Sequence, residues 1–303
     1  MSITQAHPYL IAKENPIQGL PQVFTATRSD AGPYPKKFLA LIKPMQAEEM
    51  AYLNERLALL YNPGHPLLLP VEDIVHTEHN TTLIFPWFEG VTLDTLFQRP
   101  TRLSPSVLLW IIEQTLRALC FLHQATHPTT QKPYSHQALM PNNIWISKHG
   151  HVKLANLFFE EWQDFYHKLT RTLHYNSRSM ELFSVFDGPS ELDALVQKTD
   201  VYLVGTMLYQ GLTGIPLIRR APNTKELSMI REIPSSQTLR PELSPKIHRL
   251  LEYALSFDIA SNTGHASELQ RLLSDCLFPL SSTQLEPNVI QVVQQEQPQR
   301  LLR

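Results

Sequence analysis

The sequence predicts an α+β fold with two lobes, a small β-rich N-terminal lobe with one helix and a larger helical C-terminal lobe. Strand patterns dominate residues 1–88, and helical apolar periodicity dominates residues 89–280. Strands that are followed by helices, without regular alternation, indicate an α+β domain. Residues 281–303 are rich in Gln and have few apolar clusters, so we expect a flexible C-terminal tail there.

The N-terminal lobe is predicted from short apolar runs that turn residues separate. One run alternates as a half-buried strand should, and the next is continuously apolar and ends in Lys43. A helix is expected at residues 47–60, where Tyr52 and several leucines share one apolar face. The strands are expected at residues 22–27, 38–43, 68–75 and 81–85.

The C-terminal lobe carries clear helix-start signals. Ser104 can cap a helix and Pro105 fits the first helical position, and an amphipathic pattern follows as far as Leu122. The Ser-Pro pair at residues 244–245 repeats this signal. A further apolar helix is expected at residues 201–212. Short strands are expected within residues 142–157, around a turn at residues 148–150.

Composition excludes several classes of function. The net charge of -2 over 303 residues gives no electrostatic case for nucleic acid, so no nucleic-acid partner is expected. The longest apolar stretch, residues 107–112, ends at Glu113 and falls far short of a membrane helix, so no membrane insertion is expected. Residues 1–7 lack the pattern of a secretory signal, and Cys120 and Cys276, the only cysteines, lie in apolar runs. We therefore expect reduced cysteines and a cytoplasmic protein.

The thirteen histidines do not form a metal-ligand pattern. His123 and His127 are four residues apart, but Gln124 between them is not the glutamate that a zinc protease requires. No cluster of cysteines or carboxylates accompanies the histidines, so the sequence predicts no metal site.

Several motifs occur in the order and spacing of the protein kinase family, which the chain resembles over about residues 16–273. Lys43 ends a strand that resembles the strand of the phosphate-holding lysine, and Glu55 stands where its carboxylate partner is expected. The resemblance also implies that Asp200 braces the catalytic loop and that Phe85 is the gatekeeper. The remaining matches are the hinge at residues 83–90, the catalytic loop at 135–143, the strand before the metal-binding loop at 152–158 and the central helix from 200.

The departures from the family fall on the residues that carry phosphoryl transfer. Such transfer depends on positioning and charge neutralisation. Ala138 occupies the position of the carboxylate that orients the hydroxyl nucleophile, and Met140 occupies the position of the lysine that faces the phosphate. Asn156 replaces the metal-binding aspartate, and a neutral amide is a weaker ligand than a carboxylate for Mg²⁺. Asn143, the second metal ligand, is retained. We therefore predict no functional catalytic residue and no bound metal.

The nucleotide cradle departs from the family as well. Alignment of residues 23–26 with the family's second strand puts Pro16, Gln18 and Pro21 at the three glycine positions, and proline has no amide hydrogen to offer a phosphate. Leu41 replaces the small residue above the adenine and Trp145 the aliphatic residue below it. We expect these side chains to fill the adenine site, so that ATP and Mg²⁺ bind weakly or not at all.

Lys43, Glu55 and Asn143 are therefore expected to be vestiges of a nucleotide site. Lys43 and Glu55 also fit an ion pair that holds a helix on the sheet and has no catalytic role. The leading hypothesis is a pseudokinase that binds a protein partner, as a scaffold or as an allosteric regulator of a true kinase. The alternative is a residual or atypical ATP-dependent phosphotransferase, serine/threonine kinase-like, that uses Lys43 and Asn143.

Overall fold

The computed structural model describes most of the two lobes, with the gaps that its ranges leave. The side chains of residues 3–6, 14–17, 20–21, 43, 189–194 and 282 lie outside the described part. The described ranges are 3–6, 8–17, 20–29, 36–43, 65–77, 80–126, 131, 133–155, 165–172, 189–220, 226–230, 232–256, 265–278 and 280–296.

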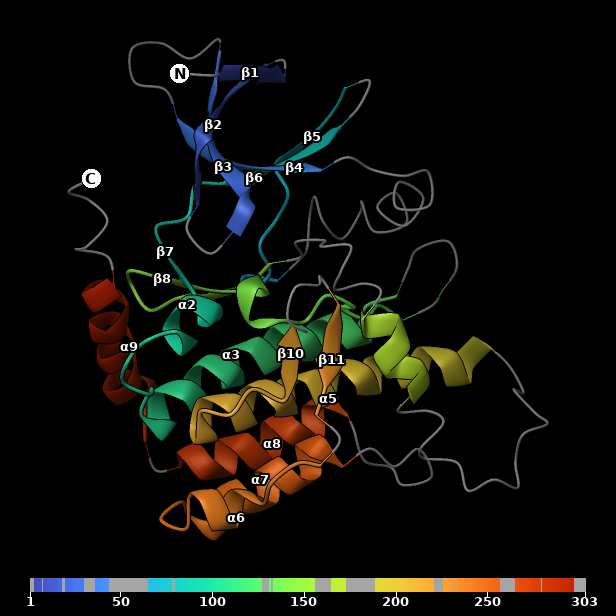
Figure 1. Cartoon of the computed structure of the whole chain (residues 1–303), viewed down its shortest axis with the longest axis vertical. Coiled ribbons are helices and arrows are strands. Elements are labelled where there is room, and N and C mark those ends of the chain that lie inside the picture. The colour runs from blue at the N-terminus through green and yellow to red at the C-terminus, as the bar shows by residue number, and fades with distance from the viewer. Residues whose placement is uncertain are drawn as a thin grey trace.

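A six-stranded antiparallel sheet forms the N-terminal lobe, in the order β1-β2-β3-β4-β6-β5 (Figure 1). The predictions at 22–27, 38–43 and 81–85 are confirmed as β3, β4 and β6. Only the end of the strand expected at 68–75 joins the sheet, and the helix expected at 47–60 lies outside the described residues. The strands are β1 (Ile3–Ala6), β2 (Tyr9–Ile17), β3 (Leu20–Arg28), β4 (Lys37–Lys43), β5 (Asp73–His76) and β6 (Thr81–Pro86).

The segment before β5 connects the two lobes, which explains why it does not join the sheet. Leu68 forms a parallel bridge with Leu154 of the C-terminal lobe. The Leu69 N–H donates to the Leu154 carbonyl at 2.9 Å, and the Leu154 N–H donates to the Leu67 carbonyl at 2.7 Å. The backbone groups of Leu67 and Leu69 are therefore paired with the other lobe, and an apolar run alone does not distinguish that pairing from a sheet strand.

The sheet is buried on both faces because β4 is apolar at successive positions. Phe38 and Ala40 belong to a cluster on one face, while Leu39 and Leu41 belong to a cluster on the other. Successive side chains of a strand point to opposite faces, so the continuous apolar run serves two cores at once. The second cluster reaches down to Trp145 of the C-terminal lobe.

The C-terminal lobe is built around the predicted helix α3 (Pro105–Gln124), which lies between α5, α8 and α9. Ser104 accepts the Val107 N–H with its hydroxyl and Pro105 occupies the first turn, as expected. By length and composition α3 could cross a membrane, but 61% of its apolar window is buried inside the protein, as in a core helix. The other helices are α2 (Leu93–Phe97), α5 (Pro189–Thr213), α6 (Ser236–Leu239), α7 (Pro245–Leu255), α8 (Ala266–Leu277) and α9 (Ser282–Glu296).

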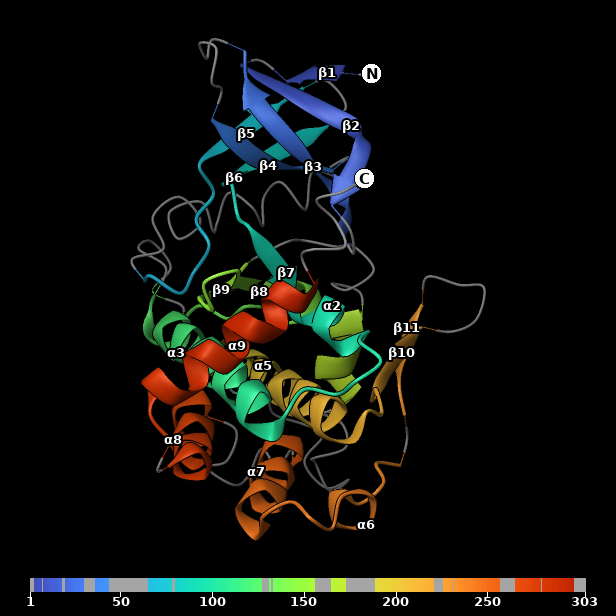
Figure 2. The same ribbon diagram turned by 90° about the vertical axis from the view of Figure 1, so that its left-hand side faces the viewer.

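A three-stranded sheet of β7, β8 and β9 lies at the top of the C-terminal lobe, below the N-terminal sheet (Figure 2). The strands expected within 142–157 are confirmed here, with Gly150 in the turn at a φ of +80°. A side chain at Gly90 would clash, because its Cβ would lie 2.1 Å from the Ile146 carbonyl oxygen. The elements are β7 (Gly90–Thr92), the 3-10 turn η1 (Pro141–Asn143), β8 (Ile144–Ser147) and β9 (Val152–Leu154).

The prediction of a flexible tail from residue 281 is wrong for Ser282–Glu296, which form helix α9. Leu285, Val289 and Val293 are buried at four-residue spacing against the C-terminal lobe. Arg99 also holds this helix, since its guanidinium lies 3.3 Å from the Glu296 carboxylate and donates to the Gln295 side chain at 2.9 Å. The composition is polar because only one narrow face is covered.

Candidate functional site

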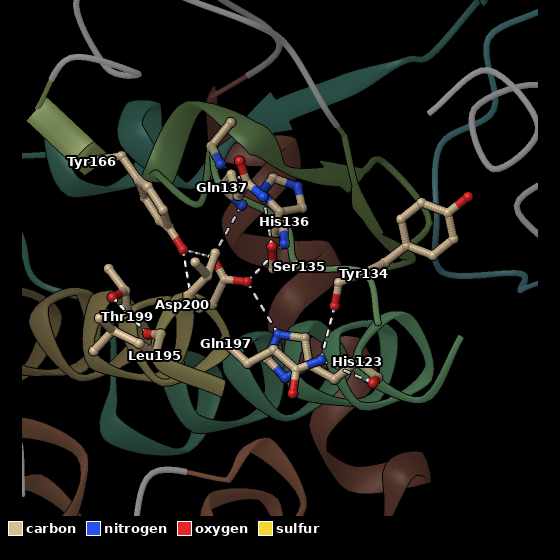
Figure 3. Close-up of polar contacts among 12 residues, drawn as sticks. His123, Tyr134, Ser135, His136, Gln137, Tyr166, Leu195, Gln197, Thr199 and Asp200 are labelled. Atoms are coloured by element: carbon tan, nitrogen blue, oxygen red, sulfur yellow. Dashed lines mark hydrogen bonds and ion pairs between the residues drawn. The ribbon is translucent and has the colours of Figure 1, made fainter. Parts of the chain in front are cut away.

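The predicted catalytic loop runs between α3 and β8 and is held by the buried Asp200 carboxylate of α5 (Figure 3). The backbone N–H of His136 donates to Asp200 Oδ2 at 2.7 Å, and that of Gln137 donates to Oδ1 at 3.1 Å. The Tyr166 hydroxyl donates to Oδ1 at 3.2 Å, and His123 Nε2 lies 3.1 Å from Oδ2. Hydrogen bonds to a charged acceptor are stronger than neutral ones, so this carboxylate fixes the loop backbone.

The hydrogen bonds to Asp200 hold Gln137 in an uncommon backbone conformation. Its φ is +59°, in the left-handed region that residues other than glycine rarely adopt. Such a conformation costs of the order of 1 kcal/mol and persists only where the surroundings enforce it. The bond from the Gln137 N–H to Asp200 supplies that constraint. The role that the resemblance implied for Asp200, bracing the loop backbone, is therefore seen in the geometry.

The ring of His136 ties the loop to the end of β9. Its Nε2 lies 2.9 Å from the Ala155 carbonyl oxygen, and the Ala138 N–H lies 3.3 Å from its Nδ1. A carbonyl can only accept, so Nε2 carries the proton and Nδ1 accepts, which assigns the neutral tautomer. The loop is thus held from both sides, by α5 and by β9.

Two positions that would carry catalysis, Ala138 and Met140, are apolar and buried. Ala138 is 1% exposed and its methyl side chain offers no acceptor, and Met140 is packed in the core of the C-terminal lobe. Asn143 is also buried, and its side-chain amide donates to the Ala138 carbonyl at 2.6 Å. The Asn143 carbonyl accepts the Ala155 N–H at 2.7 Å. Asn143 therefore connects the loop with the end of β9.

The predicted roof and floor of the adenine site meet in one apolar cluster. Leu41 from β4 is 1% exposed and Trp145 from β8 is 3% exposed, and both share this cluster with Val23 and Phe85. The Trp145 indole N–H donates to the Asn142 carbonyl at 2.8 Å, which fixes the ring. An open slot between roof and floor would leave these side chains accessible to water, so their burial indicates that they are packed together.

A hinge aromatic closes the same cluster at its outer side. The Phe88 ring lies 5.4 Å from the Trp145 ring, centroid to centroid, at an interplanar angle of 66°. Lys37 places its ammonium 5.4 Å from the centroid of the neighbouring Trp87 ring. Edge-to-face aromatic pairs add stability beyond their buried area, so Phe88 helps to fix the Trp145 ring.

The structure describes only some of the remaining predicted site residues. Lys43 ends β4 opposite Thr81, but its side chain lies outside the described part of the chain, as do Glu55, Asn156 and Gln18. Pro16 lies in β2 opposite Phe24 beside a β-bulge, a position in strands where proline is tolerated, and Pro21 lies in β3.

Two partners of Asp200 were missed by the sequence reasoning. Tyr166 is 34 residues away from Asp200 along the chain, and no local pattern indicated the contact. His123 was considered only with His127 as a possible metal pair. Among the described residues, no group of three or more His, Cys, Asp or Glu side chains could hold a metal ion.

Comparisons with known proteins agree with this geometry. The family model described as "Protein kinase domain" matches residues 20–289. The chain is 24% identical to cyclin-dependent kinase 14 of Xenopus tropicalis over 245 residues, which is 73% of this chain and 52% of that protein. It is 25% identical to cyclin-dependent kinase-like 4 of Mus musculus over 169 residues, 55% of this chain and 45% of that protein.

One similar protein is bacterial. Serine/threonine-protein kinase PrkC of Bacillus subtilis is 22% identical over 196 residues, 64% of this chain and 28% of that protein. The chain thus spans about half or less of the length of these relatives. Two lobes, a loop braced from the central helix and a match over most of the chain lead to one conclusion: the chain belongs to the protein kinase family and has its two-lobed fold.

Proposed function

We propose that this chain is a catalytically inactive kinase-like domain, a pseudokinase, which binds a protein partner as a scaffold or as an allosteric regulator. The observation that carries the proposal is Ala138, a buried methyl group at the position where the family orients its nucleophile with a carboxylate. A methyl group neither accepts a proton nor aligns a hydroxyl. In the same proposal the chain acts in the cytoplasm and binds protein, with no nucleic-acid or membrane partner.

Burial of Met140 also supports the proposal that the domain is catalytically inactive. The family places a lysine there to face the transferring phosphate, whereas the Met140 side chain is packed into the core of the C-terminal lobe. Loss of one charge-stabilising group of this kind costs about 100- to 1000-fold in rate. The losses at Ala138 and Met140 do not simply multiply, but each removes a different part of the transfer machinery.

The burial of Leu41 and Trp145 in one apolar cluster argues against a nucleotide. Their burial supports the proposal that side chains, and no planar base, occupy the space between roof and floor. The proposal therefore includes no ATP, no Mg²⁺ and no other cofactor. Lys43, Glu55 and Asn143 are then remnants, and Asn143 serves the loop by its bond to the Ala138 carbonyl.

Incubation with radiolabelled ATP tests the proposal. The full chain is incubated with ATP, Mg²⁺ and a mixture of generic protein substrates, alongside Lys43→Ala as the matched control. We expect no incorporation above the level of the control. Incorporation by the wild-type chain that disappears in Lys43→Ala would overturn the proposal.

That same outcome would favour an atypical phosphotransferase of the serine/threonine class that uses Lys43 and Asn143. Two observations favour this alternative. The relatives carry the names of kinases, and Asn143 is retained in the loop.

A further inference from the structure

A small hairpin stands on the surface of the C-terminal lobe after α5. Its strands β10 (Ile218–Arg220) and β11 (Leu227–Met229) pair antiparallel, with Arg219 opposite Ser228. Ile218, Leu227 and Met229 pack partly buried against the main core, and the Tyr202 hydroxyl lies 3.3 Å from the Met229 sulfur. The hairpin is therefore anchored by its apolar residues. Arg219 points to the opposite face, Arg220 ends the strand on the same face as Ile218, and both arginines are exposed.

The helical residues 165–172 lie beside this hairpin (Figure 1). Phe165, Tyr166 and Leu169 are buried in the core, and they set the orientation of this short helix. Lys168 and Arg171 are exposed, and since they are three residues apart they lie on the same helix face. The Lys168 ammonium lies 3.3 Å from the Glu226 carboxylate next to β11, which joins the two segments into one surface.

Positive charge gathers on this surface although the chain as a whole is negative. The basic surface consists of Lys168, Arg171, Arg219 and Arg220, all exposed, with Glu226 as the acid in its described segments. Arginines on a short strand also protect its edge from pairing with other chains. That need does not explain Lys168 and Arg171, which are on a helix. The ion pair with Glu226 accounts for Lys168 in part, but neither it nor edge protection accounts for cations that gather from two separate elements.

We propose that the basic surface docks an extended, Asp- and Glu-rich segment of a partner protein. Guanidinium groups bind carboxylates in a bidentate geometry, and exposed cations on two neighbouring segments suit an extended peptide with several carboxylates better than a single small anion. A nucleic acid fits less well. The aromatic residues of the described helix, Phe165 and Tyr166, are buried and cannot stack on bases.

This inference deepens the proposed function and rests on it in one respect, since a chain without phosphoryl transfer acts through what it binds. The probe is a fluorescein-labelled peptide of alternating Asp and Ser, and binding to the full chain is followed by fluorescence anisotropy without nucleotide. A peptide of alternating Asn and Ser is the neutral control. We expect saturable binding of the acidic peptide alone, weakened by salt because exposed charges are screened.

Charge reversal locates the site. The pairs Lys168→Glu with Arg171→Glu and Arg219→Glu with Arg220→Glu should each weaken binding at least about tenfold. The matched control is Lys246→Glu with Arg249→Glu on α7, which reverses two exposed cations three residues apart on a different helix. Binding by this control should change less than about twofold.

Three results would overturn the inference: no saturable binding of the acidic peptide, equal binding of the neutral peptide, or an equal loss in the α7 control. Thermal melts verify that each variant is folded. If a reversed pair fails to fold, neutral Arg219→Gln with Arg220→Gln takes its place, and a smaller loss of affinity is expected. Because no nucleotide is present, a failure here is distinct from a failure of the inactive-kinase proposal, which the ATP experiments decide.

Discussion

Replacement of Asp200 by alanine should destabilise the C-terminal lobe strongly. The carboxylate accepts the backbone N–H groups of His136 and Gln137, at 2.7 and 3.1 Å, in a fully buried position. Removal of the acceptor of a buried donor costs about 1–3 kcal/mol for each group. The Tyr166 hydroxyl has a single proton and lies closer to the Val196 carbonyl, at 2.7 Å, than to Oδ1, at 3.2 Å, so it keeps an acceptor and loses less. We expect the free energy of unfolding to fall by about 3–5 kcal/mol in Asp200→Ala.

Urea unfolding followed by circular dichroism measures this loss as a change in midpoint at constant slope. The matched control is Thr199→Val, at the neighbouring buried position, whose hydroxyl donates to the Leu195 carbonyl at 3.0 Å. It should cost about 1 kcal/mol or less. Asp200→Asn keeps one accepting oxygen and should lie in between. A loss in Asp200→Ala no larger than that in Thr199→Val would refute the role assigned to the carboxylate.

Three further predictions concern groups elsewhere in the fold. Burial, followed by the charge of Glu113, raises the pKa of Cys120 to about 11, so alkylation near neutral pH should be slow in the native chain and fast in urea; rapid native labelling would contradict this. Burial raises the pKa of Tyr202 to about 12, above the 10.0 of an ordinary tyrosine. The stability that Tyr202 contributes is therefore complete below pH 10 and falls as the pH rises towards 12, a loss that Tyr202→Phe should abolish in alkaline unfolding curves. Gly150→Ala should cost about 1–2 kcal/mol in urea unfolding, because φ is +80° and the new Cβ would lie 3.1 Å from Ile290 of α9; an unchanged midpoint would show that the α9 contact is absent.

Local signals in the sequence account for the parts of the fold that could be predicted. Ser104 and Pro105 specify the start of α3 by capping and by a preset backbone angle, which do not depend on tertiary contacts. At the start of helix α9 the Gln284 side-chain oxygen accepts the Ser281 N–H at 2.9 Å, as in a capping box, but the rest of this helix lacks local support. Pro287 lies inside it, and the buried face consists of few residues such as Val289. Its stability comes from packing on the C-terminal lobe, which the sequence pattern does not reveal.

Some features of the candidate site could likewise be predicted from the sequence, and others could not. The loss of chemistry at Ala138 and Met140 can be read from residue types, since neither side chain carries the group that transfer needs. The bracing by Tyr166 and His123 could not be predicted, because these residues meet Asp200 from distant parts of the chain. The filling of the adenine site stays a prediction from the size of two side chains, Leu41 and Trp145, which are buried in one cluster.

Titration of the full chain with ATP and Mg²⁺ in a thermal-shift assay tests the central claim most directly. If Leu41 and Trp145 fill the adenine site, the melting temperature should show no saturable rise, because a ligand stabilises a protein only by binding its folded state. The relative PrkC of Bacillus subtilis, measured in parallel, provides the control for the assay. A saturable rise in the wild-type chain at millimolar ATP or below would contradict the account.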